Sequence, residues 1–263
     1  MNINGLREIG KSLMKDISGM RQSPDMKKSI GYGASGDRTF PVDKRAEDII
    51  IDGLKSMKEP LTIVSEEIGV LEINGGGKRV IIDPIDGSRN AVSGIPFYCT
   101  SIAVADGETL DDVNISYVIN LGNGDEFWAE RASGAFLNGR RIQAQQENGF
   151  YMVAYETQVP GRYLPMIIPL LSASQKTRCL GAIALDLSYL ACGSMSVFVS
   201  PSLSRSFDFA GGWLLVREAG GVITDTEGRD IGDTQLDLKR RSSLVAAGNR
   251  HLHRKAIELI IRK

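Results

Sequence analysis

Cysteine and histidine are scarce in this chain, and neither residue type is arranged for catalysis or metal binding. The three cysteines are dispersed and form no C-x-x-C pair: Cys99, Cys179 and Cys192. A scattered, odd-numbered set does not predict a disulfide framework, so we expect a reducing, cytoplasmic setting and a small buried thiol at each position. The two histidines, His251 and His253, lie far in sequence from every acidic cluster. We therefore expect no histidine base and no Ser-His triad, and we place both histidines on the surface.

The chain also lacks a long apolar run and an excess of charge of either sign. Its 31 Lys and Arg residues almost balance its 32 Asp and Glu residues, and no polybasic segment indicates a nucleic-acid partner. The most apolar stretch, residues 163–171, contains two prolines and is too short to span a membrane. The first twenty residues carry charges throughout, without the apolar core of a signal peptide. Since 263 residues can bury a large core, these features favour a soluble enzyme with neither nucleic-acid nor membrane partners.

The most informative segment is DPIDGS at residues 83–88, which follows the apolar run of residues 80–82. A buried strand is therefore followed by two carboxylates, Asp83 and Asp86, with a proline between them and a glycine turn after them. Hard divalent cations prefer oxygen ligands of this kind, and the backbone N–H groups of Gly87 and Ser88 suit a phosphate oxygen. The segment indicates metal-assisted phosphoryl chemistry. The alternative is an ordinary strand-terminating turn, because Asp-Pro and Asp-Gly are common turn dipeptides.

Four more acidic residues lie at the ends or starts of predicted elements. Glu66 and Glu67 come directly after the strand pattern of residues 61–65. Asp43 lies in a first helical turn opened by Pro41, and Asp208 opens a later helix. Each has a structural alternative: the glutamates can face solvent, Asp43 can interact with the helix dipole at about 0.3–1 kcal/mol, and Asp208 can be an N-cap.

Taken together, these segments resemble the inositol monophosphatase superfamily. That family carries a Glu-Glu pair after a strand, a strand ending D-P-I-D-G-[ST], and a later helix with the pattern W-D-x-A-[AG]-G-x-x-[IL]-[LV]-x-E-A-G-G. This chain has SEEIG at 65–69, DPIDGS at 83–88 and FDFAGGWLLVREAGG at 207–221, in the same order and with matching spacing. Ser88 in place of Thr and Phe207 in place of Trp resemble the archaeal, fructose-1,6-bisphosphatase-like branch.

By this resemblance the chain binds two or three Mg²⁺ ions. Glu66, Asp83 and the carbonyl of Ile85 would hold one ion. Asp83, Asp86 and Asp208 would hold a second, and Glu66 with a neighbouring loop would serve a weaker third. Clustered carboxylates repel by roughly 4 kcal/mol per unit-charge pair about 4 Å apart at an effective dielectric of about 20, so such a cluster requires cations between its members.

The resemblance also implies the catalytic roles. Asp43 and Ser88 would orient and deprotonate the attacking water, with Glu66 contributing to catalysis beside them. Gly87 and Ser88, at a helix start, would receive the phosphate. Glu67 would support the cluster rather than bind metal. The alternative from a different functional class is a catalytically silent binding or regulatory member, and the retained acids argue against it.

A polar, Gly-rich loop is predicted at residues 21–40, and we expect it to be mobile. Asp37 and Thr39 on this loop would meet the third metal or would simply be solvated. The stretch GYGASG at 31–36 matches G-x-G-x-x-G, but it neither follows a strand nor opens a helix directly, so a dinucleotide site is not indicated. A loop that closes over a metal–phosphate site explains these glycines better.

The sequence indicates the type of reaction more clearly than it indicates the substrate. An inositol-specific member of the family places a Glu seven residues before the helix Asp, where this chain has Pro201. A second phosphate could be met by Arg205, Arg178 or Tyr155, because arginine matches phosphate well. The alternative is that these three are ordinary surface or core residues. We also expect Asp86 to contact the substrate. We expect a small sugar or polyol phosphate as partner, with inositol-1-phosphate and fructose-1,6-bisphosphate leading. A 3′-phosphoadenosine 5′-phosphate phosphatase is the enzymatic alternative, and we expect a homodimer.

The order of elements predicts an α+β, metal-binding half at residues 1–145 and an α/β half at 146–263 that completes the active site. The resemblance implies a layered sandwich of alternating helix–sheet–helix–sheet–helix. Helices are predicted at residues 3–20, 42–57, 162–172, 183–192, 209–219 and 251–261. Strands are predicted at residues 61–65, 80–82, 100–105, 113–121, 126–129, 151–155, 197–199 and 244–246.

Overall fold

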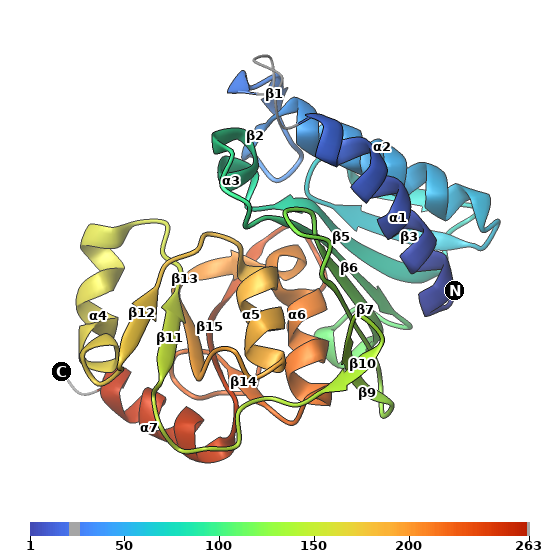
Figure 1. Ribbon diagram of the computed structural model, residues 1–263. Coiled ribbons are helices and arrows are strands. Elements are labelled where there is room, and N and C mark those ends of the chain that lie inside the picture. Colours follow the sequence, from blue (N-terminus) through green and yellow to red (C-terminus); the bar gives the residue numbers. More distant parts are fainter. Residues whose placement is uncertain (21–26, 262–263) are drawn as a thin grey trace.

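Alternating layers, helix–sheet–helix–sheet–helix, make up the part of the chain that the computed structural model describes, residues 1–20 and 27–261 (Figure 1). The layered α+β prediction is confirmed. Residues 21–26 of the predicted loop 21–40 lie outside the described residues. The helices are α1 (Ile3–Met20), α2 (Pro41–Ser56), α3 (Ser88–Ser93), the 3₁₀ helix η2 (Leu110–Asp112), α4 (Pro160–Ser172), α5 (Ile183–Ala191), α6 (Ser206–Glu218) and α7 (Arg250–Ile261).

The larger sheet has the strand order β10-β9-β8-β7-β6-β5-β3-β4 and is antiparallel except where β3 lies parallel to β5. Its strands are β3 (Leu61–Ser65), β4 (Gly69–Ile73), β5 (Lys78–Asp86), β6 (Cys99–Ala105), β7 (Val113–Asn120), β8 (Glu126–Glu130), β9 (Gly134–Leu137) and β10 (Arg140–Ile142). The short strands β1 (Gly31–Tyr32) and β2 (Arg38–Thr39) form a separate hairpin from the second part of the predicted loop.

The smaller sheet has the order β12-β11-β13-β15-β14, and β11 is parallel to both of its neighbours. Its strands are β11 (Met152–Tyr155), β12 (Lys176–Arg178), β13 (Val197–Arg205), β14 (Val222–Thr224) and β15 (Arg240–Ala247). The chain therefore passes from one sheet to the other between residues 142 and 152. One continuous hydrophobic cluster nevertheless joins the two sheets through α5 and α6.

Helices α1 and α2 cover the outer face of the larger sheet because each carries an apolar stripe of helical period (Figure 1). The buried α1 residues recur every three or four positions, as the period of an α-helix requires: Leu6, Ile9, Leu13 and Ile17. In α2, Ala46, Ile50, Ile51 and Leu54 lie in the core, whereas Ile49 is only half-buried.

Helices α5 and α6 lie between the two sheets and are apolar on almost every side, as a helix with no solvent-facing side should be. They approach each other closely at Gly212, where an added Cβ would lie 2.5 Å from Cβ of Leu187. Helices α4 and α7 cover the outer face of the smaller sheet over a third cluster. No helix among residues 1–20 and 27–261 is both long and apolar enough to cross a membrane.

Several elements differ from the sequence prediction. Strand β5 continues through the DPIDGS segment to Asp86 instead of ending at residue 82, and β13 continues to Arg205 instead of ending at residue 199. Both extensions contain a proline and a shift of register, which a pattern of alternating apolar residues does not show. The short strands β4, β9, β10, β12 and β14 and the β1–β2 hairpin were not predicted.

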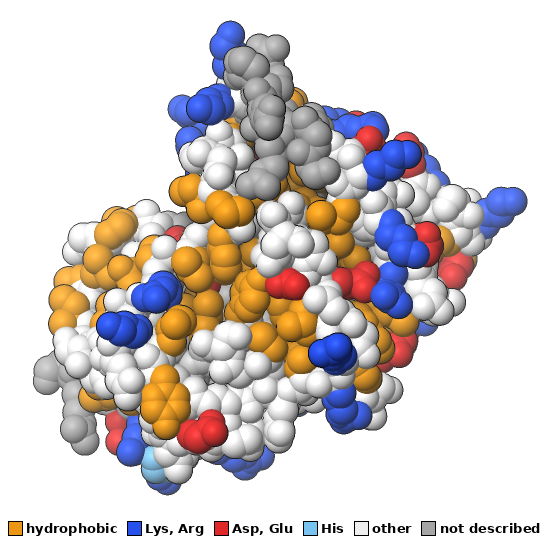
Figure 2. All heavy atoms as spheres, in the orientation of Figure 1, with side chains coloured by type: hydrophobic (Ala, Val, Ile, Leu, Met, Phe, Trp, Pro, Cys, Tyr) orange, Lys and Arg blue, Asp and Glu red, His pale blue; other side chains and the backbone are white. Residues whose placement is uncertain are grey.

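The face drawn in Figure 2 shows Lys and Arg side chains as small separate groups rather than as one basic patch. The cysteines differ in environment: Cys99 is buried, Cys192 is half-buried and Cys179 is exposed. The prediction of a buried thiol at every position is therefore wrong at Cys179, which follows the exposed edge strand β12.

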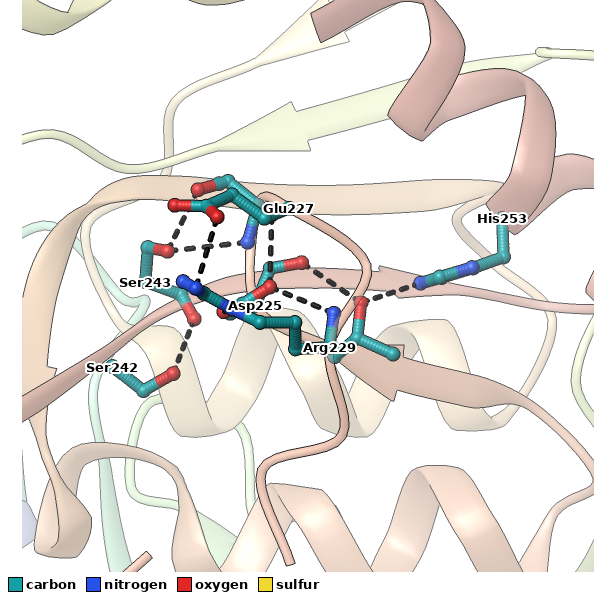
Figure 3. Close-up of polar contacts among 8 residues, drawn as sticks. Asp225, Glu227, Arg229, Ser242, Ser243 and His253 are labelled. Atoms are coloured by element: carbon teal, nitrogen blue, oxygen red, sulfur yellow. Dashed lines mark hydrogen bonds and ion pairs between the residues drawn. The ribbon is translucent and has the colours of Figure 1, made fainter. Parts of the chain in front are cut away.

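His253 is buried, so its predicted surface position is wrong. Its Nε2 lies 2.8 Å from the hydroxyl of Thr224, which joins α7 to the end of β14 (Figure 3). Next to this contact, Asp225 closes the following turn by accepting hydrogen bonds from the backbone and side chain of Arg229 (Figure 3). A histidine near a chain terminus therefore serves to attach the last helix to the smaller sheet.

We expect the stability of the wild type to fall on acidification through His253. Burial lowers the pKa of His253, so the unfolded chain takes up a proton first as the pH falls below about 6.5. The stabilisation is complete above that pH and is lost toward the lower pKa of the folded state. The variant His253→Phe should cost about 1 kcal/mol at high pH, from the lost hydrogen bond, and its deficit should shrink as the pH falls.

Urea unfolding of the two proteins at a series of pH values measures this deficit, with His251→Phe as the matched control on the same helix. A deficit that stays constant from pH 8 to pH 5 would show that His253 does not titrate on unfolding as proposed.

Candidate active site

A cavity of about 690 Å³ opens where the ends of β3 and β5, the start of α6 and the β1–β2 hairpin meet. Figure 1 shows α3 beside β2 above the end of β5, at the junction of the two sheets. Five carboxylate residues from four segments line this cavity: Asp37, Glu66, Asp83, Asp86 and Asp208. Five of the acids that were singled out in the sequence are therefore brought to one place, and Asp43 is joined to them through its contact with Ser88.

Strand β5 presents Asp83 and Asp86 to the same cavity because its register shifts between them. Asp83 pairs with Ser101 of β6 and Asp86 pairs with Cys99, so three steps along β5 oppose two steps along β6. In a regular strand, residues three apart point to opposite faces of the sheet. The extra residue of this bulge removes that alternation.

Backbone amides orient two of these carboxylates from the second half of the chain. Oδ2 of Asp86 accepts a 2.6 Å hydrogen bond from the N–H of Ala184, at the start of α5. Oδ2 of Asp208 accepts a 2.8 Å hydrogen bond from the N–H of Arg205. Arg205 is the N-cap of α6 and Asp208 is the third residue of the helix, which corrects the alternative in which Asp208 is the N-cap.

Asp43 occupies the same position at the start of α2, where Pro41 is the first helical residue. Its Oδ2 accepts a 2.6 Å hydrogen bond from the N–H of Phe40, and its Oδ1 lies 2.7 Å from the hydroxyl of Ser88. The Ser88 hydroxyl also lies 2.8 Å from the carbonyl oxygen of Ile85. Burial raises the pKa of Asp43 to about 7, which places its proton affinity near neutral pH.

Gly87 turns the chain from β5 into α3 with a φ of 89°, a left-handed conformation that favours glycine. An added Cβ would lie 3.1 Å from the carbonyl oxygens of both Phe97 and Gly181, so space as well as conformation requires glycine here. Gly87 and Ser88 both line the cavity beside the acids.

The buried acids raise one another's pKa values. Burial, with the neighbouring charge of Asp208 next in effect, raises the pKa values of both Glu66 and Asp86. Burial and the charge of Glu66 raise the pKa of Asp83, whose Oδ1 has no hydrogen-bond partner among the described residues. An all-oxygen donor set with an unpartnered buried carboxylate oxygen fits a hard divalent cation.

Among the described residues no three acidic, histidine or cysteine side chains already converge as ligands of one ion. We therefore expect a cation to draw the carboxylates together on binding.

The Glu66-Glu67 turn is held from both sides. The hairpin donates backbone hydrogen bonds from Ser35 to the carbonyl of Glu66 at 3.0 Å and from Ala34 to that of Glu67 at 2.9 Å. The Thr39 hydroxyl donates to the carboxylate of Glu67. On the other side, Glu47 of α2 accepts hydrogen bonds from Ser65 at 2.6 Å and from the N–H of Ile68 at 2.9 Å. Thr39 and Glu67 thus support each other at the edge of the site.

The predicted substrate residues other than Asp86 lie outside the cavity. Arg205 forms an ion pair with Asp37 and donates a 2.7 Å hydrogen bond to the carbonyl of Ser35, so it fastens the hairpin to the start of α6. Arg178 is exposed on the edge strand β12. Tyr155 packs against the hydrophobic cluster beneath α4 and α7.

Sequence reasoning missed several other residues that line the cavity, among them Tyr32, Arg38, Arg89 and Gln158. The two arginines supply positive charge at a site whose other charged lining residues are acids, and the guanidinium of Arg89 lies 5.4 Å from the ring centre of Phe40. Arg89 directly follows the DPIDGS segment, which was the available indication in the sequence.

Comparison with known proteins agrees with this arrangement. The model of the inositol monophosphatase family matches residues 5–263. A Methanothermobacter thermautotrophicus protein named fructose-1,6-bisphosphatase/inositol-1-monophosphatase is 36% identical, with 96% of this chain and 94% of the relative aligned. A Pyrococcus furiosus protein named fructose-1,6-bisphosphatase is 32% identical, with 99% of this chain and 100% of the relative aligned.

Solved structures agree as well. The extragenic suppressor protein suhB from Bartonella henselae is 30% identical and superposes with a TM-score of 0.81, covering 99% of this chain and 98% of that one. A Pyrococcus horikoshii protein with similarities to inositol-1 monophosphatase is 28% identical and superposes with a TM-score of 0.82 over 100% of both chains. The protein belongs to the inositol monophosphatase family and is a phosphatase.

Proposed function

We propose that this protein is a Mg²⁺-dependent phosphomonoesterase that hydrolyses small sugar or polyol phosphates, with inositol-1-phosphate and fructose-1,6-bisphosphate as leading substrates. The observation that carries the proposal is the Asp43–Ser88 pair, which lies at 2.7 Å directly behind a cavity lined by five acids. The names of the aligned archaeal relatives support the choice of substrates.

The cation ligands proposed are Glu66, Asp83, the Ile85 carbonyl, Asp86 and Asp208, which together would hold two ions. When bound, Mg²⁺ neutralises phosphate oxygens and acidifies the attacking water. A third ion near Glu66 with Asp37 and Thr39 would have to compete with the contacts that these two residues make to Arg205 and Glu67.

The chain's own residues supply the proton chemistry and the orientation of the phosphate. Asp43 Oδ1 accepts a proton through Ser88 Oγ, while its other oxygen stays fixed by the N–H of Phe40. Glu66, across the cavity, contributes to orienting the water. Gly87 and Ser88 receive the phosphate at the turn where β5 enters α3. The water next to the Asp43–Ser88 pair attacks the phosphorus in line. The ester oxygen that leaves must therefore lie on the opposite side of the phosphorus from this pair.

We also propose a cytoplasmic homodimer with an α+β half at residues 1–145 and an α/β half at 146–263. Dispersed free cysteines support the reducing location. Light scattering on the purified protein tests the dimer.

Activity should require Mg²⁺ and vanish when the protein is stripped with excess EDTA, since this site offers no other electrophile of comparable charge. Saturating Mg²⁺ should also raise the midpoint of thermal unfolding by about 5–10 °C, because a ligand that binds only the native state stabilises it. Phosphate release and thermal unfolding, each with added Na⁺ as the control cation, measure these effects. Full turnover in EDTA would exclude the metal-dependent mechanism.

Asp43→Asn should lower kcat by about 10²–10⁴, the usual range for loss of a general base, while Mg²⁺ affinity changes little. Asp83→Asn should instead lower the Mg²⁺ affinity, because it removes a ligand proposed to be shared by both ions. Its loss of activity should follow from the loss of metal. Mg²⁺ titrations of activity and calorimetric metal binding separate the two effects. Near-normal kcat for Asp43→Asn at saturating Mg²⁺ would mean that another group takes the proton.

The metal-free protein should lose stability as the pH rises. Because the folded-state pKa values of Glu66, Asp83 and Asp86 are raised, the unfolded chain releases their protons at lower pH than the folded chain does. This stabilisation is present below about pH 4 and is lost progressively as the pH rises toward the raised values.

Metal-free Asp83→Asn should therefore be at least as stable as the wild type at pH 8. Chemical unfolding in EDTA at several pH values measures this, with Asp48→Asn on the exposed side of α2 as the matched control. A metal-free wild type that gains stability between pH 5 and pH 8 relative to Asp83→Asn would contradict the repulsion.

A further inference from the structure

Arg38 and Arg89 are the basic side chains among the described residues that line the acidic cavity. Arg38 belongs to strand β2 of the hairpin, and Arg89 lies in the first turn of α3. A third arginine near the site, Arg205, is already neutralised by its ion pair with Asp37. Arg38 and Arg89 are both exposed, and neither forms an ion pair with another residue in the described ranges 1–20 and 27–261. Two unneutralised cations therefore border the cavity.

The pairing of the hairpin strands sets the side to which Arg38 points. Tyr32 of β1 lies directly opposite Arg38 of β2, so the two side chains share one face of the hairpin. The next residue, Thr39, points to the other face, where its hydroxyl donates to the carboxylate of Glu67. Tyr32 and Arg38 accordingly line the cavity. The contact between Thr39 and Glu67 thus keeps Arg38 on the cavity side.

Arg89 is held by an aromatic ring rather than by an acid. Its guanidinium lies 5.4 Å from the ring centre of Phe40, within the range of a cation–π contact. Phe40 is buried, lines the cavity and has extended backbone angles two residues after Arg38, so its ring and Arg38 lie on the same side of the chain. A ring accepts no hydrogen bond from the edge of a guanidinium, so the N–H groups of Arg89 stay available to a ligand.

These residues place positive charge on the hairpin side of the site, and we call Tyr32, Arg38, Phe40 and Arg89 the arginine wall. Figure 1 shows α3 beside β2, above the end of β5 that carries the acids. The cavity of about 690 Å³ is large enough for a whole small molecule, so room remains beyond a phosphate bound at Gly87 and Ser88.

We propose that Arg38 and Arg89 form a second anion site, which binds a phosphate group that is not hydrolysed and so favours substrates that carry two phosphates. The inference rests on the proposed function, since it takes the reacting phosphate to lie at the acids. A planar guanidinium donates two parallel hydrogen bonds to phosphate oxygens, which suits this role better than a point charge does. The second phosphate can be carried by a sugar or by a nucleoside, because the arginines recognise the phosphate itself.

The second site discriminates between substrates by charge. A monophosphate whose phosphate lies at the acids offers nothing to the arginine wall, whereas a bisphosphate is held at both ends. Because Arg38 and Arg89 are exposed, salt screens their attraction for the second phosphate. The preference for a bisphosphate over a monophosphate should therefore fall as the ionic strength rises.

The test compares wild type, Arg38→Gln, Arg89→Gln and the exposed control Arg140→Gln in saturating Mg²⁺. The substrates are fructose 1,6-bisphosphate, adenosine 3′,5′-bisphosphate and inositol 1-phosphate. Each cavity variant should lower kcat/KM for a bisphosphate by about 5- to 30-fold, mainly through KM, because it loses a charged hydrogen bond made before and during the reaction. The value for inositol 1-phosphate should change less than about 3-fold, and Arg140→Gln should match the wild type. A loss with the fructose compound identifies a sugar as the carrier, and a loss with the adenosine compound identifies a nucleoside.

A second measurement does not depend on turnover. With Mg²⁺ and inorganic phosphate filling the reacting site, fructose 6-phosphate or adenosine 5′-phosphate should raise the midpoint of thermal unfolding of wild type and Arg140→Gln. The same compounds should raise the midpoints of Arg38→Gln and Arg89→Gln less, and unphosphorylated fructose or adenosine should not reproduce the difference.

Equal losses on monophosphate and bisphosphates would show that the arginines hold the reacting phosphate, and would overturn the second site. A midpoint shift that is the same in all four proteins, or turnover of inositol 1-phosphate alone, would also overturn it. Absence of turnover on every substrate, with the midpoint shift still dependent on Arg38 and Arg89, would overturn the proposed function and leave the second anion site standing.

Discussion

Mutual repulsion among buried carboxylates is the constraint on which the rest of this structure depends. Glu66, Asp83 and Asp86 share one cavity with Asp208, and their pKa values are raised by burial and by one another. Left to themselves, such groups would move apart or take up protons. The fold resists this by fixing one oxygen of several acids with a backbone amide. Asp43 and Asp208 are each held at the third position of a helix by the N–H of its N-cap residue, and the other oxygen of Asp43 accepts a hydrogen bond from Ser88.

The same constraint explains why the site lies between the two sheets. The acids of β3 and β5 come from the first sheet, whereas the groups that orient them come partly from the second half of the chain. The start of α5 donates to Asp86, and Arg205 at the end of β13 fastens the hairpin through Asp37. Helices α5 and α6 pack against both sheets in one hydrophobic core. The geometry of the acids therefore depends on the packing of the whole chain.

The sequence was sufficient for the family, the layered fold and the acidic cluster, because the combined spacing of SEEIG, DPIDGS and the later helix is far more specific than any single motif. Periodicity located the long helices correctly, since one apolar stripe determines each of them. Periodicity failed where contacts between residues far apart in the sequence determine the local structure. The bulge that turns both Asp83 and Asp86 toward one cavity has no periodic pattern, and His253 is buried by a contact with a strand about thirty residues earlier.

Substrate contacts were the least predictable part, for a physical reason. Arginine was expected to meet phosphate wherever it occurred near the site, but Arg205 forms an ion pair with Asp37 and Arg178 lies on an exposed edge. Position relative to a cavity, rather than residue type, decides which group a substrate meets. An acid was sought on β13 at Pro201, yet the carboxylate beside the acidic cavity comes from the neighbouring strand, as Glu156. Strand β11 ends opposite Val199 of the longer strand β13, so the residue that follows β11 supplies a carboxylate beside a stretch of β13 that carries no acid.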